Sequence, residues 1–312
     1  MKVLDQIVLN FSQQGLLALN IVIALIMFGV ALDIRWRHFI DLLKNPKSVI
    51  VGVVSQFLML PALTFLLVLI VKPTPTVALG MILVAACPGG NISNFMSYLA
   101  KGNTALSVSL TAVSTSLAVL MTPLNFTLWG KLYLDFYERS DAGAYLVPIE
   151  IELFEVAQTV VLLLGLPVFL GLMFRHYLPR LTQKILRPVR TGSIVVFIAY
   201  VIILLSANFE PFIRYIHLVF LIVLVHNALA LGTGFSLASL LKLPRVDRRT
   251  VTIETGIQNS GLALVLIFNP NIFPPELQLG GMAFIAAWWG VWHIVSGLIL
   301  AGLWSRKKLN KA

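Results

Sequence analysis

The segment TVALGMILVAACPGGNISNFMSYLAK, residues 76–101, decides the fold, because it is an apolar run of membrane-spanning length that is interrupted at Pro88-Gly89-Gly90. A helix needs about 20 mostly apolar residues to cross a bilayer. A break inside lipid leaves backbone N–H and C=O groups without partners, which costs several kcal/mol for each group. We therefore expect this segment to lie inside protein or beside a water-filled cavity.

The composition of the whole chain agrees with a membrane protein. Of its 312 residues 58% are hydrophobic and 12% are charged, and the mean hydropathy is +0.92. A soluble domain carries roughly 25% charged residues, so a soluble enzyme, a disordered protein and a fibrous protein are all excluded. The sequence predicts an all-α polytopic membrane protein with lipid over most of its surface.

Nine apolar segments are long enough to span a membrane. They cover residues 15–32, 48–71, 76–101, 104–130, 150–174, 191–207, 212–241, 250–269 and 277–304. Most of the 23 basic residues fall in the connections on one side, which the positive-inside rule assigns to the cytoplasm. We expect a multi-pass protein of the cell inner (plasma) membrane, with its N-terminus outside (periplasmic) and its C-terminus in the cytoplasm.

A second segment, TVTIETGIQNSGLALVLIFN at residues 250–269, is also interrupted, at glycines flanked by polar side chains. Each interrupted segment is followed by one intact span. This spacing indicates two repeats of opposite topology, residues 1–130 with four spans and residues 150–304 with five. Paired interruptions are typical of transporter binding sites, whereas a single Pro-Gly-Gly is also common as a packing or kink site.

Glu254 is the only carboxylate that we expect well inside a span. A carboxylate at this depth costs about 2.5–3.5 kcal/mol and so indicates a functional site. No Lys or Arg is predicted at the same depth, which leaves a proton or a metal ion as its partner. Ser107 and Thr111 lie four residues apart, on one helix face. The oxygen-bearing side chains that favour Na+ here are Gln56, Ser93, Asn94, Ser107, Thr111 and Gln258.

Other polar residues are predicted to have structural roles. His226-Asn227 lies deep in the seventh span and is expected to form helix–helix hydrogen bonds. Glu150, Glu152 and Glu155 cluster at the outer end of the fifth span and are expected at the membrane interface. Cys87 is predicted to be an inert core residue.

Three long stretches resemble the bile acid:sodium symporter family. They are CPGGNISNFMSYLAKGNTALSVSLTAVST (87–115), IETGIQNSGLAL (253–264) and VWHIVSGLILAGLW (291–304). The likeness covers nearly the whole chain, from IMFGVALD (26–33) to the last span, and indicates a bacterial member with nine transmembrane helices. The resemblance implies a core domain of spans 2–4 and 7–9, in which two broken helices cross, and a panel domain of spans 1, 5 and 6.

The resemblance also implies two Na+ sites. The first consists of Ser93, Asn94, Ser107, Thr111 and Glu254, and the second of Gln56, Glu254 and Gln258 with backbone carbonyls near Thr255 and Ile257. Asn91 and Ile294 depart from the Thr and Asn that many bacterial relatives have there. Both positions face substrate in the family's architecture, so the departures leave the identity of the substrate open.

Free N–H groups at the starts of two half-helices, near Asn91 and near Asn259-Ser260, favour an anionic substrate. We expect a sodium-coupled symporter that moves an organic anion by alternating access, with two Na+ per substrate. A small monocarboxylate such as pantoate or a 2-oxo acid fits, and so does a bile-acid-like steroid. A lone His such as His293 is more often a packed, hydrogen-bonded ring than a ligand. The predicted substrate contacts are Asn91, Ile92, Asn259, Ser260, His293 and Ile294.

Two alternatives are left open by the residues alone. A proton-coupled or uncoupled organic-anion carrier would use Glu254 as a proton site. An intramembrane enzyme would use Glu254 and His293 as acid and base, but no HExxH, GxSxG or Walker motif accompanies them, so no enzymatic activity is predicted. The basic connections are too short and scattered for a nucleic-acid surface, and no obligate protein partner is predicted.

Overall fold

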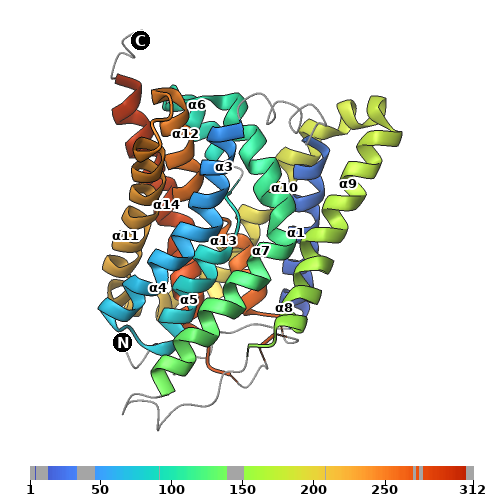
Figure 1. Cartoon of the computed structure of the whole chain (residues 1–312). Coiled ribbons are helices and arrows are strands. Elements are labelled where there is room, and N and C mark those ends of the chain that lie inside the picture. The colour runs from blue at the N-terminus through green and yellow to red at the C-terminus, as the bar shows by residue number, and fades with distance from the viewer. Residues whose placement is uncertain are drawn as a thin grey trace.

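The computed structural model describes residues 4, 13–33, 46–90, 92–138, 151–207, 209–269, 272–273 and 277–306. Across these ranges every regular element is a helix and no strand occurs. The helices form one elongated bundle (Figure 1). They are α1 (Gln13–Asp33), α3 (Pro46–Val54), the π-helical turn η2 (Ser55–Met59), α4 (Leu60–Val71), α5 (Pro75–Ala86), α6 (Ile92–Leu99), α7 (Thr104–Glu138), α8 (Leu153–Val160), the π-helical turn η4 (Val161–Gly165), α9 (Leu166–Tyr177), α10 (Pro179–Ala207), α11 (Phe209–Leu240), α12 (Arg245–Gly256), α13 (Ser260–Ile267) and α14 (Gly280–Arg306).

Five helical stretches among the described residues are clearly long and apolar enough to cross a bilayer. They are Pro46–Val71, Thr104–Tyr137, Leu153–Tyr177, Ile213–Leu240 and Gly280–Arg306. Large apolar side chains on these stretches point away from the protein, for example Ile70 and Phe154, which are 78% and 77% exposed. Lipid contact explains such exposure, because a bilayer solvates apolar side chains as well as a protein core does. The prediction of an all-α membrane protein is confirmed.

Both predicted interruptions are present. α5 ends at Ala86 and α6 begins at Ile92, while α12 ends at Gly256 and α13 begins at Ser260. Two other boundaries differ from expectation. The helix expected over 191–207 begins at Pro179, and the helix expected over 104–130 continues to Glu138. Both extensions carry charged residues, which an apolar-run criterion leaves out although charged side chains are compatible with a helix that leaves the membrane.

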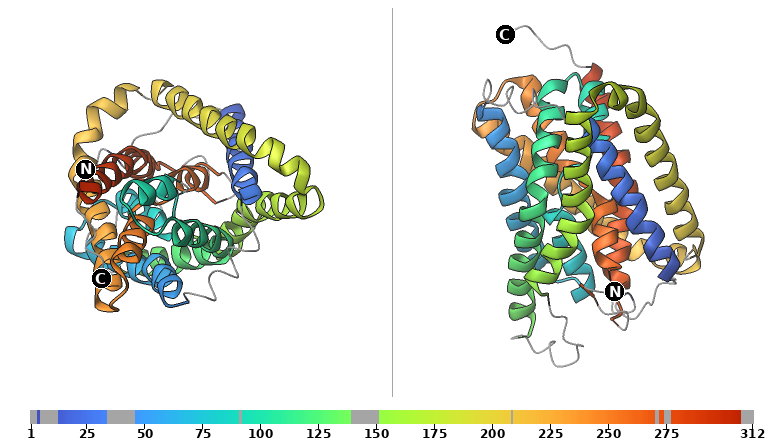
Figure 2. Two further views of the ribbon diagram at one scale, coloured as in Figure 1. Left: turned by 90° about the horizontal axis from the view of Figure 1, so that it is seen from above. Right: turned by 90° about the vertical axis from the view of Figure 1, so that its right-hand side faces the viewer.

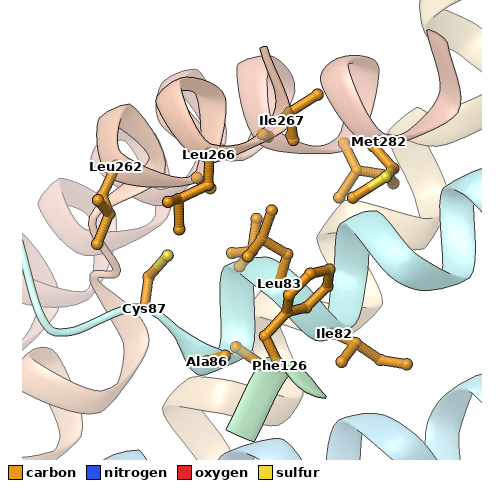
Figure 3. Close-up of a cluster of buried hydrophobic side chains, with 14 of the residues drawn as sticks. Ile82, Leu83, Ala86, Cys87, Phe126, Leu262, Leu266, Ile267 and Met282 are labelled. Atoms are coloured by element: carbon orange, nitrogen blue, oxygen red, sulfur yellow. The ribbon is translucent and has the colours of Figure 1, made fainter. Parts of the chain in front are cut away.

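The apolar core gathers around α5 and α13. Every residue of α5 and of α13 is buried. Leu83 and Cys87 face Leu262 and Leu266 across the gap between these helices, and Met282 of α14 closes the far side (Figure 3). Cys87 has no exposed surface, so its predicted place in the core is confirmed. Because α5 and α13 are short, packing against their neighbours stabilises them more than their intrinsic helix propensity does.

Most basic residues of the described ranges belong to helix ends and connections at one end of the bundle, which is the upper end in Figure 1. There α1, α6, α9, α11 and α14 end, and α3, α7, α10 and α12 begin. The helix ends and connections here carry most of the basic side chains of the described ranges, among them Lys47, Lys101, Arg175, Arg180, Lys184, Lys242, Arg245 and Arg306. The basic residues therefore gather at one end of the bundle, as predicted. Which side of the membrane this end faces stays a prediction.

We predict that Gly80→Ala destabilises the bundle. A Cβ at Gly80 would lie 2.7 Å from the backbone Cα of Met282, so α5 and α14 would have to move apart. Overpacking of this kind costs about 1–3 kcal/mol, which thermal unfolding in detergent detects.

The matched control is Gly232→Ala on α11, where an added Cβ meets nothing within 4 Å. This variant should unfold at the parental temperature or slightly above, because Ala favours helix over Gly. Equal melting temperatures for the two variants would contradict the close α5–α14 packing.

Candidate functional site

The two interruptions lie side by side at the centre of the bundle. The Gly90 N–H donates to the Ile257 carbonyl at 2.7 Å, and the Asn259 N–H donates to the Pro88 carbonyl at 2.8 Å. The pair forms an isolated antiparallel bridge between Gly89 and Gln258. These bonds satisfy backbone groups that the breaks remove from the helices, which is the condition for unwound chain at membrane depth.

Glu254 lies beside this bridge, two residues before the end of α12, and is 1% exposed. Its Oε1 accepts a hydrogen bond from Ser93 Oγ at 2.6 Å and a shorter one from Ser107 Oγ. Thr111 Oγ1 lies 3.2 Å from both carboxylate oxygens. The carboxylate of α12 thus contacts one hydroxyl from α6 and two from α7.

The remaining member of the first predicted ion set also joins the cluster. Thr111 Oγ1 donates to Asn94 Oδ1 at 3.3 Å. The fold therefore brings together Ser93, Asn94, Ser107, Thr111 and Glu254. Ser97, which the sequence did not single out, is buried and accepts from Ser107 Oγ at 3.2 Å. Its position four residues after Ser93, on the same face of α6, is the signal that could have found it.

The second predicted set also gathers around the bridge and the end of α12. Gln56 Nε2 donates to the Glu254 carbonyl at 2.7 Å, and Gln258 Nε2 donates to the Thr255 carbonyl at 2.7 Å. The side-chain oxygens Gln56 Oε1 and Gln258 Oε1 are buried, and neither accepts a hydrogen bond from any described residue. Buried amide oxygens without a donor are rare and usually have a functional explanation.

A π-helical turn places Gln56. Pro61 has no N–H, and the neighbouring Leu60 N–H bonds to the Ser55 carbonyl five residues back. The side chains of Ser55 and Gln56 in this turn both reach α12: Ser55 Oγ accepts from Thr255 Oγ1 at 2.9 Å, and Gln56 bonds to the Glu254 carbonyl. Such turns occur frequently at functional sites. The signal in the sequence was the proline five residues after the buried glutamine.

The predicted helix–helix hydrogen bonds of His226-Asn227 are confirmed. His226 Nε2 lies 2.9 Å from Thr64 Oγ1 of α4. Asn227 Nδ2 donates to the Gly256 carbonyl at 2.8 Å, and Asn227 Oδ1 accepts from Ser296 Oγ of α14 at 2.5 Å. Asn227 therefore also supports the second interruption directly, because the Gly256 carbonyl lies at the end of α12.

The predicted substrate residues are more dispersed. Asn91 lies outside the described residues. Asn259 caps α13, because its Oδ1 accepts from the Leu262 N–H at 3.0 Å, and Ser260 begins that helix. His293 is 5% exposed, and its Nδ1 has no partner within the described ranges.

The two predicted isoleucine contacts differ in burial. Ile92 begins α6 and is 37% exposed. Ile294 packs against an apolar cluster that includes Met96 and Ile257. Its place is therefore beside α6 and the second interruption, among apolar side chains.

A second buried carboxylate, Asp247, was missed. Its Oδ2 accepts from Ser48 Oγ at 2.6 Å and its Oδ1 accepts from Asn103 Nδ2 at 2.9 Å. Nearby, Arg249 Nη1 donates to the Ala100 carbonyl at 2.7 Å. These bonds tie the start of α12 to α3 and to the α6–α7 connection. No apolar run marks Asp247, which lies just outside the predicted span, so its burial depends on tertiary packing.

Comparison with known proteins identifies the family. The model of the Sodium Bile acid symporter family matches residues 20–215. The uncharacterized sodium-dependent transporter YocS of Bacillus subtilis (strain 168) is 33% identical over 97% of this chain and 89% of its own length. The ileal sodium/bile acid cotransporter of Cricetulus griseus is 30% identical, over 84% of this chain and 71% of its own. The probable sodium/metabolite cotransporter BASS1, chloroplastic, of Arabidopsis thaliana is 29% identical, over 90% and 65%.

The extent of these matches confirms the resemblance to the bile acid:sodium symporter family that the sequence motifs indicated. Relatives of this kind are transporters and not enzymes, and their names imply the use of Na+. The chain belongs to the sodium bile acid symporter family of sodium-dependent membrane transporters.

Proposed function

We propose that this protein is a sodium-coupled symporter that moves one organic anion with two Na+ by alternating access. The observation that carries the proposal is the Glu254 cluster: one buried carboxylate contacted by three hydroxyls, beside two buried amide oxygens that lack donors. Hard cations prefer oxygen ligands, and one anionic ligand among neutral ones suits a monovalent ion.

The first Na+ would take the Glu254 carboxylate together with Ser93, Asn94, Ser107 and Thr111. The hydroxyls of Ser93, Ser107 and Thr111 donate to the carboxylate, and each oxygen keeps lone pairs through which it could also coordinate the cation.

The second Na+ would lie near Gln56 and Gln258. Their free Oε1 atoms, the carbonyls near Thr255 and Ile257, and the Glu254 side chain supply the oxygens. A Cβ at Gly89 would lie 2.5 Å from Gln56 Nε2 and 3.1 Å from Glu254 Oε2, so the connection between α5 and α6 passes directly over this group.

The substrate would bind where the two half-helices begin. Their first N–H groups carry partial positive charge and favour an anion. Both named substrate types of the relatives, bile acid and metabolite, are compatible with an anionic end and an otherwise apolar molecule. We propose a small monocarboxylate such as pantoate or a 2-oxo acid, or a bile-acid-like steroid, in contact with Asn91, Ile92, Asn259, Ser260, His293 and Ile294.

The proposed architecture is nine transmembrane helices in two inverted repeats, residues 1–130 and 150–304, with the N-terminus outside and the C-terminus in the cytoplasm. The moving parts would be a core of α3 to α7 and α11 to α14, and a panel of α1, α8, α9 and α10. Support comes from the packing of α1 against α9 and α10 on one side of the bundle (Figure 2, left). Sodium would order the α5–α6 and α12–α13 connections and so preform the anion site. Sodium would then raise the affinity for substrate, and substrate would raise the affinity for sodium by the same factor.

A proton-coupled or uncoupled carrier is the second candidate, because the described part of the chain gives Glu254 no basic partner. Replacing Na+ by choline separates the two proposals. A sodium symporter then loses uptake, whereas a proton-coupled carrier keeps it and responds to a pH gradient.

We predict that Glu254→Gln abolishes sodium-dependent uptake in proteoliposomes, because a neutral amide cannot replace the charge that both ion sites share. Charge-assisted bonds are worth about 1.5–3 kcal/mol, so apparent sodium affinity should fall at least tenfold. Glu155→Gln is the control, since Glu155 is an exposed carboxylate in the first turn of α8. A folded Glu254→Gln protein that transports normally would exclude Glu254 as an ion ligand.

We predict that Gly89→Ala lowers the apparent affinity for sodium without unfolding the protein. The added Cβ would displace the Gln56 amide from the Glu254 carbonyl. Overpacking of about 1–3 kcal/mol at the site corresponds to roughly a tenfold higher sodium requirement. Sodium titrations of uptake by Gly89→Ala and Gly232→Ala test this, and identical curves would refute the placement of the second site.

We predict that uptake is electrogenic. Two Na+ and one monoanion carry a net charge of +1, which gains about 2.3 kcal/mol per 100 mV. A potassium diffusion potential of about 100 mV, inside negative, should therefore raise the accumulation of the transported substrate by up to about 50-fold. Radiolabelled pantoate, pyruvate and cholate are the substrates to test. Accumulation that ignores the potential would contradict the proposed stoichiometry.

A further inference from the structure

The first three turns of α10, residues 179–190, form a basic amphipathic helix with the sequence PRLTQKILRPVR. Arg180, Lys184 and Arg187 are spaced four and three residues apart, so they share one face, and all three are exposed. The opposite face carries Thr182, Ile185, Leu186 and Val189, of which Thr182 is 2% exposed. Residues 175–190 contain no Asp or Glu.

This segment, which we call the elbow, sits where the chain leaves one span and enters the next. The candidate span Leu153–Tyr177 ends just before it. α10 starts at the upper end of the molecule and then bends downward alongside α1 (Figure 2, right). Pro188 lies inside α10 and lacks the N–H of a regular turn, which explains a bend at this point. The elbow therefore follows directly on the end of an apolar candidate span, where lipid headgroups are expected.

The basic face of the elbow is unused by the part of the chain that the structure describes. No described residue forms an ion pair or hydrogen bond with Arg180, Lys184 or Arg187. Arg175, one turn earlier, is different, because it donates to the Leu32 carbonyl at the end of α1 and so holds α9 against that helix. The elbow thus combines a fixed position with three positive charges that have no partner among the described residues.

We propose that the elbow binds the headgroups of anionic phospholipids. Arg180, Lys184 and Arg187 would contact lipid phosphates, and Leu181, which is 44% exposed, would enter the acyl boundary. A basic face opposite an apolar face is the pattern of helices that lie in the membrane interface. Basic residues close to a span are attracted to anionic lipid over about one Debye length. A bilayer surface is expected close to this point, because the candidate span Leu153–Tyr177 ends just before the elbow.

Lipid-quenching measurements test this directly. The chain has a single cysteine, Cys87, and it is buried. In a Cys87→Ala background, a fluorophore on Gln183→Cys reports the elbow, because Gln183 is exposed next to the basic face. Nanodiscs would contain brominated phosphatidylglycerol in plain phosphatidylcholine, or the reverse, at equal mole fractions. We expect the brominated anionic lipid to quench at least about twice as strongly as the brominated neutral lipid.

Two controls isolate the basic face. The triple variant R180Q/K184Q/R187Q should bring the quenching ratio to one, whereas K72Q/K131Q/R214Q, which removes three exposed charges elsewhere, should leave it unchanged. High salt should lower the ratio in the labelled parent protein, which keeps the test valid if the triple variant fails to fold. A ratio of one in the parent, or a high ratio that persists in R180Q/K184Q/R187Q, would overturn the proposal.

Discussion

Two backbone hydrogen bonds between unwound segments hold the centre of this molecule. Gly90 donates to Ile257 and Asn259 donates to Pro88, so each interruption satisfies part of the other. Neither helix could be broken alone at this depth, because lipid offers no partners for free N–H and C=O groups. The crossing therefore requires both segments at once, and it fixes the end of α12 that carries Glu254.

Side chains from the surrounding helices complete this arrangement. Asn227 donates to the Gly256 carbonyl, Gln56 to that of Glu254 and Gln258 to that of Thr255, so three consecutive carbonyls at the end of α12 each receive an amide donor. The same network positions the Glu254 carboxylate among its hydroxyls. An ion that attracts these oxygens must also adjust the two connections. In the proposed function, shared hydrogen bonds would therefore link ion binding to the shape of the substrate site, and this link would couple the two.

Much of this was predictable because the strongest constraints are local. Pro88-Gly89-Gly90 and Gly256 mark the breaks, and the four-residue spacing of Ser107 and Thr111 places both on the face of α7 that meets Glu254. What the sequence did not reveal depends on tertiary packing. In the sequence Asp247 resembles an ordinary surface carboxylate, and only the fold brings Ser48 and Asn103 close enough to bond to it. The start of α10 was missed because its charges break the apolar run without breaking the helix. Asn91, the predicted substrate contact at the start of α6, lies outside the described residues.

The most direct test of the central claim is the thermal stability of the purified protein in Na+, compared with K+ and choline at equal ionic strength. A ligand that binds only the folded state raises its stability, by about 2.7 kcal/mol at a hundred times its dissociation constant. The account predicts a higher unfolding temperature in Na+ alone, and no such difference in Glu254→Gln. Identical unfolding temperatures in the three salts, or a sodium effect that Glu254→Gln retains, would contradict a sodium site at Glu254.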